Sequence, residues 1–492
     1  MPPSPWRAHP FGIFAAVADF RFVHAADLHL DAPFKGISNT APQVAEALRE
    51  ASLRALDNLV ELCMERDAAF LVLAGDLYDG PVHGLRAQLR LRDGLARLSD
   101  AGIPTFVAHG NHDPLETGWS AVSERWPERA MVFPAGTVGV GVVERGGEPI
   151  ALVHGISYAR RDVRDNLARG FARRPSLVFQ VGVLHCAVAG ASDHHAAYSP
   201  CSLDDLYAAG LDYWALGHVH GRKVLAGEPY GAGPWVVYPG TLQGRSPRPG
   251  EVGVKGATVV EVRGGRVAAA EHVACDEIRF ERVEIDLGRT PTCDSVADLR
   301  DTLSEAALAT TEGAGGRSVV LRARLTGRSP LASEMKRRGA LEELLASLRE
   351  EAPAGDPFCW WDEIEDASRP DVDLAALRRG GDFVADLVNL ADELSGAAPG
   401  AFAGRVSLAE PAPTEHAAPY ACGPAGATGR REGSVDPLEA MRAALVEGLP
   451  TSLRQRADRL LDGEPSLWSD LLSDGLALAL DRLGVGSEAG GP

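Results

Sequence analysis

Residues Phe20-Arg-Phe-Val-His-Ala-Ala-Asp-Leu-His29 form a short apolar run that ends in two polar side chains, Asp27 and His29. Residues two apart on an extended backbone point to the same side, so this pair can hold a single ion. More apolar runs in the first half of the chain end in the same way, at Gly75-Asp76, Gly110-Asn-His-Asp113, His185 and Gly217-His-Val-His220. We therefore expect these side chains to project from one rim of a sheet.

Amphipathic segments at 42–66 and 84–100 lie between these apolar runs. A short apolar run bounded by turn residues is typical of a buried strand, and the longer amphipathic segments are typical of helices. Strands that alternate with helices predict a layered α/β domain. Open sheets of this class bind ligands at the carboxyl ends of their strands, where the polar side chains are expected.

The polar side chains of these segments make up a set of metal ligands without a thiolate: Asp27, His29, Asp76, Asn111, His185, His218 and His220. This set is too large for one four-coordinate zinc ion, and it suits two octahedral-type divalent ions that share one carboxylate. Mixed carboxylate and imidazole ligands favour Mn²⁺ or Fe²⁺ over Mg²⁺, with Zn²⁺ still allowed by affinity. Two such ions clamp a phosphate and activate a water, so the pattern predicts phosphoester hydrolysis.

Two further residues complete the predicted catalytic group. His112 follows the ligand Asn111 and is placed to protonate a leaving alkoxide, and Asp113 is expected to hold His112 in the required tautomer. The apolar surroundings of His24, His109 and His154 predict buried structural histidines instead.

Arginine-rich segments offer contacts for phosphate oxygens, because the guanidinium fork matches them. Residues 158–174 hold six arginines against two aspartates, although a solvated helix face would have the same composition. The predicted substrate-binding residues are Arg160, Arg161, Arg245, Arg248 and Lys255.

Length and composition set further bounds. The 492 residues are enough for two or three domains, and no apolar run approaches the length of a membrane span. Seven scattered cysteines without a Cys-x-x-Cys pair indicate reduced thiols and a cytoplasmic protein. Residues 1–275 carry 26 Lys and Arg against 29 Asp and Glu, whereas residues 276–492 carry 23 against 39. A polyanion must therefore be bound by local patches in the first half.

The second half predicts separate parts. Strand and helix patterns alternate at 278–287, 295–309, 317–325, 332–351, 358–365 and 373–395, and Ala, Gly and Pro make up 23 of the 40 residues of 396–435. The predicted organisation is an N-terminal extension at 1–20, a catalytic domain at 21–275, an α+β capping domain at 276–395, a flexible linker at 396–435 and a helical partner-binding module at 436–492.

The motifs DLH, GDLYD, GNHD, LH and GHVH, in this order over roughly 21–260, resemble those of the calcineurin-like metallophosphoesterases. Longer stretches resemble the bacterial DNA-repair exonuclease branch, the SbcD-like and especially the YhaO-like proteins. They are His24–Gly36, Tyr198–Ser202, Asp212–His220, Tyr238–Arg245 and Gly253–Gly256.

The resemblance implies a β-sandwich flanked by helices, in four αββα layers, with a two-metal site at the strand ends. It implies that the seven residues above are metal ligands, that His112 is catalytic and that the ions are Mn²⁺. It further implies cleavage of DNA phosphodiesters, an SMC-like coiled-coil ABC ATPase partner that we expect at the C-terminal helices, and a homodimer formed through the catalytic domains.

Two positions depart from the family pattern. Asp79 stands where archaeal and eukaryotic relatives carry a second catalytic histidine, and Ser246–Gly250 follows Gln-Gly-Arg where YhaO-like proteins usually continue with histidine. Two other functions stay open from the sequence. One is hydrolysis of a small nucleotide or phosphomonoester, and the other is a non-cleaving scaffold that regulates an ATPase.

Overall fold

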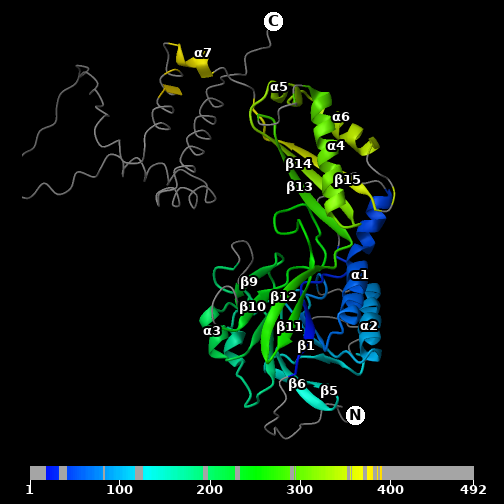
Figure 1. Cartoon of the computed structure of the whole chain (residues 1–492), viewed down its shortest axis with the longest axis vertical. Coiled ribbons are helices and arrows are strands. Elements are labelled where there is room, and N and C mark those ends of the chain that lie inside the picture. The colour runs from blue at the N-terminus through cyan, green and yellow to red at the C-terminus, as the bar shows by residue number, and fades with distance from the viewer. Residues whose placement is uncertain are drawn as a thin grey trace, which may run out of the picture. The chain divides into compact units, whose positions relative to one another are not determined.

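A computed structural model of the chain shows two six-stranded sheets, followed by a smaller three-stranded sheet (Figure 1). The structure describes residues 18–32, 42–80, 84–116, 126–191, 198–227, 233–288, 293, 295–351, 355, 357–369, 374–380, 385 and 388–389. The predicted linker at 396–435, the predicted module at 436–492 and most of the predicted N-terminal extension lie outside the described residues. None of the described helices is long and apolar enough to cross a lipid bilayer.

The first sheet has the strand order β12-β11-β1-β2-β3-β4. Strands β1 to β4 are parallel, whereas β11 and β12 add as antiparallel strands at one side. The strands are β1 (Phe20–Ala25), β2 (Leu71–Ala74), β3 (Thr105–Ala108), β4 (Ala130–Val132), β11 (Gly256–Arg263) and β12 (Arg266–Ala274).

The second sheet has the order β5-β6-β7-β8-β10-β9, with a parallel centre and an antiparallel strand at each edge. Its strands are β5 (Gly139–Arg145), β6 (Glu148–Gly155), β7 (Phe179–His185), β8 (Tyr213–Gly217), β9 (Lys223–Ala226) and β10 (Trp235–Tyr238). We call the two sheets and their covering helices, residues 20–274, the two-sheet domain.

Aromatic side chains fill the space between the two sheets. Phe22 stacks on Phe70 with ring centroids 4.7 Å apart and meets Tyr213 of the other sheet edge-on at 5.2 Å. The outer face of the first sheet packs against α1 (Pro42–Glu65) and α2 (Leu85–Asp100), and that of the second against α3 (Leu203–Ala208) and the short 3₁₀ helix η1 (Leu167–Gly170). This arrangement confirms the predicted four αββα layers, because each sheet has one face toward the other sheet and one toward helices.

The three-stranded domain, residues 278–366, follows the predicted alternation of strands and helices. Its elements are β13 (Ile278–Asp286), α4 (Val296–Gly313), β14 (Ser318–Thr326), α5 (Leu331–Met335), α6 (Ala340–Glu351) and β15 (Cys359–Asp366), with α7 (Leu374–Arg378) beyond it. All three strands are parallel, so α/β describes this domain more closely than the predicted α+β. The predicted helix at 332–351 is two helices, because Gly339 adopts a positive φ of 90° between them.

Contacts group Met1–Gly327 with Ser333–Ser368 in one compact unit, and Arg328–Ala332 with the chain from Arg369 onward in a second. Within the first unit, apolar side chains of the start of α1 pack on β13 and β14 through Val44, Leu48, Phe280 and Val320.

Candidate metal centre

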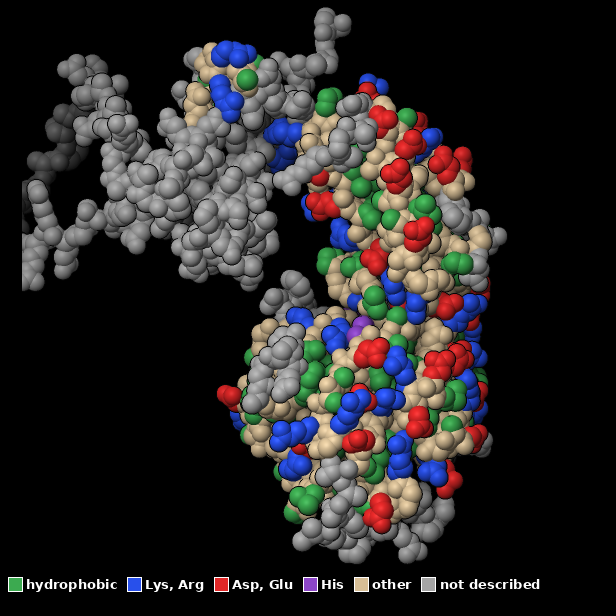
Figure 2. Space-filling model, viewed as in Figure 1, with side chains coloured by type: hydrophobic (Ala, Val, Ile, Leu, Met, Phe, Trp, Pro, Cys, Tyr) green, Lys and Arg blue, Asp and Glu red, His purple; other side chains and the backbone are tan. Residues whose placement is uncertain are grey.

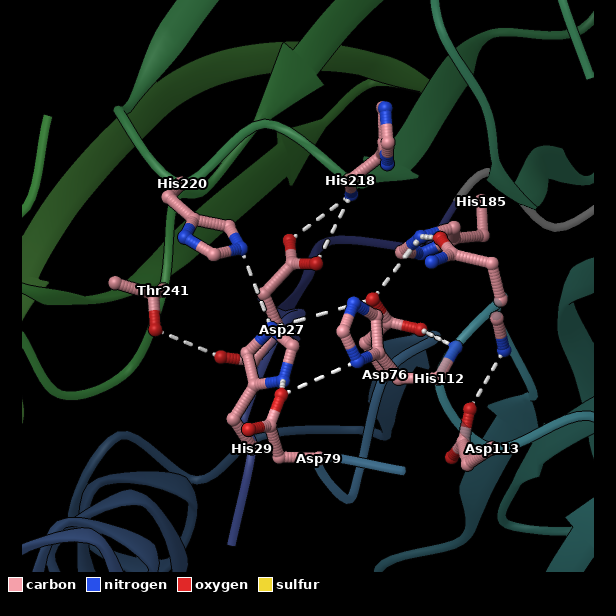
Figure 3. A network of polar contacts seen from close by, with 12 residues as sticks. Asp27, His29, Asp76, Asp79, His112, Asp113, His185, His218, His220 and Thr241 are labelled. Carbon is pink, nitrogen blue, oxygen red and sulfur yellow. Dashed lines mark hydrogen bonds and ion pairs between the residues drawn. The ribbon is translucent and has the colours of Figure 1, made fainter. Parts of the chain in front are cut away.

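The predicted metal ligands follow strands of both large sheets. The first sheet contributes Asp27 and His29 after β1, Asp76 after β2 and Asn111 after β3, while the second contributes His185 at the end of β7 and His218 and His220 after β8. Figure 3 shows six of these seven residues as labelled sticks around a common space. The site therefore forms only where the two sheets are stacked.

Four of these residues adopt backbone conformations that residues other than glycine rarely adopt. The φ angles are 52° at Asp27, 43° at His29, 51° at Asp76 and 109° at His218. Such strained residues gather at functional sites and persist where surrounding bonds hold them. Here the amide of Asp27 donates to the carbonyl of Gly75 at 3.0 Å, and that of His29 to the carbonyl of Asp76 at 3.0 Å.

Two glycines let the backbone approach the ligands closely. A Cβ at Gly110 would lie 2.3 Å from Asp76 Oδ1, and a Cβ at Gly75 would lie 2.4 Å from Nδ1 of His185. The glycine before each ligand is thus a requirement of packing around the site.

The first group of ligand atoms comes from Asp27, His29 and His220. The two imidazoles face each other, with His29 Nε2 3.2 Å from His220 Nε2. Their other nitrogens lie against carboxylates, Nδ1 of His220 at 2.6 Å from Glu251 Oε1 and Nδ1 of His29 at 3.3 Å from Asp79 Oδ1. A proton on each Nδ1 leaves lone pairs on the two facing Nε2 atoms, and a cation is the partner that both can bind.

The second group comes from Asp27, Asp76 and His185. His185 Nδ1 donates to the carbonyl of Ala74 at 3.0 Å, so its Nε2 carries a lone pair. That Nε2 lies 3.0 Å from Asn111 Oδ1 and 3.4 Å from Asp76 Oδ2. Asp76 Oδ2 is also 4.0 Å from His29 Nε2, so this carboxylate lies between the two groups. The donor set of this site therefore fits two divalent cations that share a carboxylate.

His218 is placed differently from the other predicted ligands. Its backbone amide donates to both carboxylate oxygens of Asp27, at 3.1 and 3.0 Å. Its ring lies 5.3 Å from the ring of His185 and 5.7 Å from that of Tyr198, and Figure 3 shows the side chain pointing away from the Asp27 carboxylate. The structure brings His218 to the edge of the site without directing its ring nitrogens into either group of ligand atoms described above.

Burial dominates the electrostatics of the ligands. It raises the pKa of Asp76 to about 7, with a further contribution from the charge of Asp113, and it raises the pKa of Asp27 well above its usual range. Burial also lowers the pKa of His185 to about 4, which keeps that imidazole neutral and able to bind a metal. Two buried carboxylates this close need added positive charge nearby, and a divalent cation would supply it.

The predicted role of Asp113 is wrong. His112 Nδ1 lies 3.1 Å from Asp79 Oδ1, whereas the Asp113 carboxylate accepts hydrogen bonds from the amides of Leu77 and Gly110 at 2.9 and 2.8 Å. Asp113 also faces Nδ1 of the buried His109 at 3.1 Å. Asp113 thus binds backbone amides of the loops after β2 and β3. The carboxylate beside His112 Nδ1 is that of Asp79, from the loop after β2.

The predicted cations are spread over different environments. Arg245 lies in the site, where its guanidinium faces Asp79 and Glu251, whereas Lys255 is buried and donates from Nζ to the carbonyl of Gly250. A buried ammonium bound in this way is turned away from a substrate, so the prediction for Lys255 is wrong.

The exposed predicted cations are Arg160, Arg161 and Arg248. Asp79 raises the pKa of His112, and burial and the charge of Arg161 oppose that effect, which places Arg161 near His112.

Two carboxylates of the site were not predicted as functional residues. Asp79 departs from the family pattern in the sequence, and Glu251 follows a Pro-Gly pair without a recognisable motif. The second Asp of Gly-Asp-Leu-Tyr-Asp, three residues after the ligand Asp76, was the available signal for Asp79.

Comparisons with known proteins agree with this geometry. The calcineurin-like phosphoesterase family model matches residues 20–222, and the model of the middle domain of metallophosphoesterase YhaO matches residues 280–369. The chain is 32% identical over 384 residues to the uncharacterized metallophosphoesterase YhaO of Bacillus subtilis, covering 77% of this chain and 90% of that relative.

Two further relatives are more distant or matched over less of their length. The DNA double-strand break repair protein Mre11 of Aeropyrum pernix is 27% identical over 281 residues, 54% of this chain and 64% of that protein. The UDP-2,3-diacylglucosamine hydrolase of Pseudomonas fluorescens is 32% identical over 120 residues, 23% of this chain and 44% of that enzyme.

The chain belongs to the calcineurin-like metallophosphoesterases. Within that family it combines the phosphoesterase domain with a middle domain of the YhaO type, as the two-sheet and three-stranded domains show.

Proposed function

We propose that this protein is a two-metal-dependent DNA phosphodiesterase that acts as the nuclease subunit of a DNA-repair complex. The observation that carries the hydrolytic part is the position of Asp76 Oδ2, 3.4 Å from Nε2 of His185 and 4.0 Å from Nε2 of His29. The DNA part is supported by several relatives named as DNA double-strand break repair protein Mre11.

Each group of ligand atoms would hold one divalent cation, which we propose to be Mn²⁺. Asp27, His29 and His220 would form one site, and Asp76, Asn111 and His185 the other, with Asp27 near both and His218 at the edge. When bound, two such ions polarise phosphate oxygens and lower the pKa of a bound water.

His112 is the proposed proton donor to the leaving oxygen. Its Nδ1 lies 3.1 Å from Asp79 Oδ1, so the proton on Nδ1 points at that carboxylate and Nε2 is directed elsewhere. The side chain of His112 is 31% exposed. Asp79 thus stabilises the protonated imidazole and fixes its orientation, as carboxylates do for catalytic histidines.

The proposed DNA contacts are the exposed arginines Arg160, Arg161 and Arg248. On the face drawn in Figure 2, Lys and Arg side chains lie scattered among acidic ones over the two-sheet domain. A duplex would therefore meet local arginines beside the site instead of a uniformly basic surface, in keeping with the net charge of −19.

The partnership with an SMC-like coiled-coil ABC ATPase, a homodimer and a cytoplasmic location belong to the same proposal. The match to the UDP-2,3-diacylglucosamine hydrolase over 120 residues favours, as a second candidate, hydrolysis of a small nucleotide-linked phosphoester.

The test incubates the purified protein and Mn²⁺ with linear duplex DNA, single-stranded DNA and nucleotide substrates in parallel. The wild type should cleave DNA, Asp76→Asn should not, and Asp67→Asn, whose side chain is 93% exposed, should match the wild type. Turnover of a nucleotide without DNA cleavage would replace the nuclease proposal by the small-substrate one. ATPase stimulation that survives Asp76→Asn, with no hydrolysis of any substrate, would favour the scaffold.

A further inference from the structure

We propose that Arg245 is a positioning residue that joins the two carboxylates orienting three histidines of the metal centre, and that it is not a phosphate-binding residue. The inference rests on the proposed metal site and assigns a role to a side chain that the sequence suggested for substrate contact. It is carried by the contacts that converge on Asp79 and Glu251.

Asp79 is the first of the two carboxylates. Its Oδ1 lies 3.3 Å from Nδ1 of His29, 3.1 Å from Nδ1 of His112 and 3.3 Å from Nη1 of Arg245. One carboxylate oxygen therefore lies within ion-pair distance of three nitrogens, one on a proposed metal-ligating imidazole, one on the proposed catalytic imidazole and one on the guanidinium.

Glu251 is the second carboxylate, and Arg245 contacts it from both backbone and side chain. Glu251 Oε2 accepts a hydrogen bond from the backbone amide of Arg245 at 3.0 Å, and Nη2 lies 3.8 Å from Oε1. The same Oε1 is 2.6 Å from Nδ1 of His220. The guanidinium thus connects the carboxylate behind His220 to the one behind His29 and His112.

The donors of Arg245 are directed at protein groups. The side chain is 19% exposed, its two terminal nitrogens face carboxylates, and its buried Nε has no hydrogen-bond partner among the described residues. A phosphate oxygen at this guanidinium would have to displace Asp79 or Glu251 and would be repelled by both. The planar fork of arginine reaches two carboxylates at once, which the single ammonium of lysine does not.

Removal of the guanidinium should weaken metal binding and leave substrate binding nearly unchanged. Without it, Asp79 and Glu251 lose their shared partner, and the rings of His29 and His220 lose their fixed orientation. Loss of such outer partners typically weakens metal binding by about 10- to 100-fold.

The experiment measures Mn²⁺ binding by isothermal titration calorimetry to the full-length wild type, Arg245→Gln, Arg245→Lys and a control, Arg263→Gln. Arg263 is an exposed arginine of β11 that pairs with Glu261 at 2.9 Å. We expect Arg245→Gln to weaken at least one Mn²⁺ site by 10- to 100-fold, Arg245→Lys to fall between it and the wild type, and Arg263→Gln to bind as the wild type does.

Kinetics with bis(p-nitrophenyl) phosphate at saturating Mn²⁺ separate the two roles of Arg245. Positioning predicts a KM within about threefold of the wild type once the metal sites are filled. A KM raised tenfold or more with unchanged Mn²⁺ affinity would overturn the proposal and make Arg245 a phosphate contact. Wild-type protein that binds two Mn²⁺ ions but leaves DNA intact would refute the nuclease function and leave this inference standing.

A comparison with a double variant distinguishes a local effect on metal binding from a general loss of folding. Arg245→Gln, Glu251→Gln and the double variant are compared by thermal unfolding without metal and by Mn²⁺ titration. If both residues act through one contact, the double variant should bind Mn²⁺ no more weakly than the weaker single variant. Fully additive losses of affinity would contradict the proposal.

Discussion

At the scale of single residues, the chemistry of the site depends on which ring nitrogen of each histidine carries its proton. Nδ1 of His29, His185 and His220 faces a carboxylate or carbonyl oxygen, at distances of 3.3, 3.0 and 2.6 Å. Each Nε2 is thereby left as a lone-pair donor directed into the site. Hydrogen bonds hold His185 and His220 from behind, as is usual for metal-binding histidines, whereas Nδ1 of His29 lies only at ion-pair distance from Asp79.

Asp79→Asn tests this arrangement at one residue. The asparagine would present at most one acceptor oxygen to the donors of His29, His112 and Arg245, so the two rings should lose their orientation. We expect kcat for bis(p-nitrophenyl) phosphate to fall at least about tenfold at saturating Mn²⁺. The exposed Asp67→Asn is the matched control, and an unchanged kcat in Asp79→Asn would refute the role of this carboxylate.

His24 predicts a pH dependence of stability away from the metal ligands. Its ring contacts the hydroxyl of Tyr213 at 3.1 Å and the carbonyl of Leu216 at 3.2 Å, and burial lowers its pKa to about 3. The unfolded chain therefore binds a proton more readily than the folded one as the pH falls below about 6.5. This group contributes stability above that pH, and the contribution is lost at up to about 1.4 kcal/mol per pH unit between pH 6.5 and 3.

The measurement is the urea midpoint at pH 7 and pH 5 for the wild type and His24→Gln. Glutamine can keep one donor and one acceptor but does not titrate, so its loss of stability on acidification should be smaller. Equal losses in the two proteins would show that His24 does not titrate across folding.

The strand-end motifs of the sequence predicted which segments meet at the site. They did not predict which carboxylates lie behind the histidines of the site. Asp113 follows His112 directly, yet Asp79, 33 positions earlier, provides the carboxylate at His112 Nδ1. Sequence spacing predicts which segments meet at a rim of the sheet. It does not predict the path of a loop after the strand, where hydrogen bonds to Leu77 and Gly110 turn the Asp113 side chain away.

At the scale of elements, the strands place the site and the turns after them shape it. The loops after β1, β2 and β3 each carry ligands, and the loops after β1 and β2 are joined by the hydrogen bonds from Asp27 to Gly75 and from His29 to Asp76. The sequence predicted these strands from short apolar runs. It did not predict the break between α5 and α6, because the effect of Gly339 depends on its left-handed backbone conformation.

Gly110→Ala tests the close approach of the β2 and β3 loops. The new Cβ would lie 2.3 Å from Asp76 Oδ1 and 2.9 Å from its backbone nitrogen, so the Asp76 carboxylate must move. We expect Mn²⁺ affinity to fall at least about tenfold by titration calorimetry. Gly313→Ala, where a Cβ meets nothing within 4 Å, is the control and should bind Mn²⁺ normally. Normal binding by Gly110→Ala would show that this loop contact is dispensable.

At the scale of the whole molecule, the metal centre is a product of stacking two sheets. Both groups that we assign to the cations need the two sheets, because each combines residues after β1 or β2 with a histidine after β7 or β8. The alternation of strands and helices, together with the family motifs, was enough to predict the four layers. The distances between ligand atoms of different sheets depend on how the sheets pack, with Phe22, Phe70 and Tyr213 among the rings between them.

The most direct test of the account is a crystal structure with Mn²⁺, in which anomalous scattering locates the metal. The account predicts two ions, one beside His29 and His220 and one beside His185 and Asn111, with the Asp76 carboxylate bound to both. One ion, or two ions that do not both bind Asp76, would contradict it.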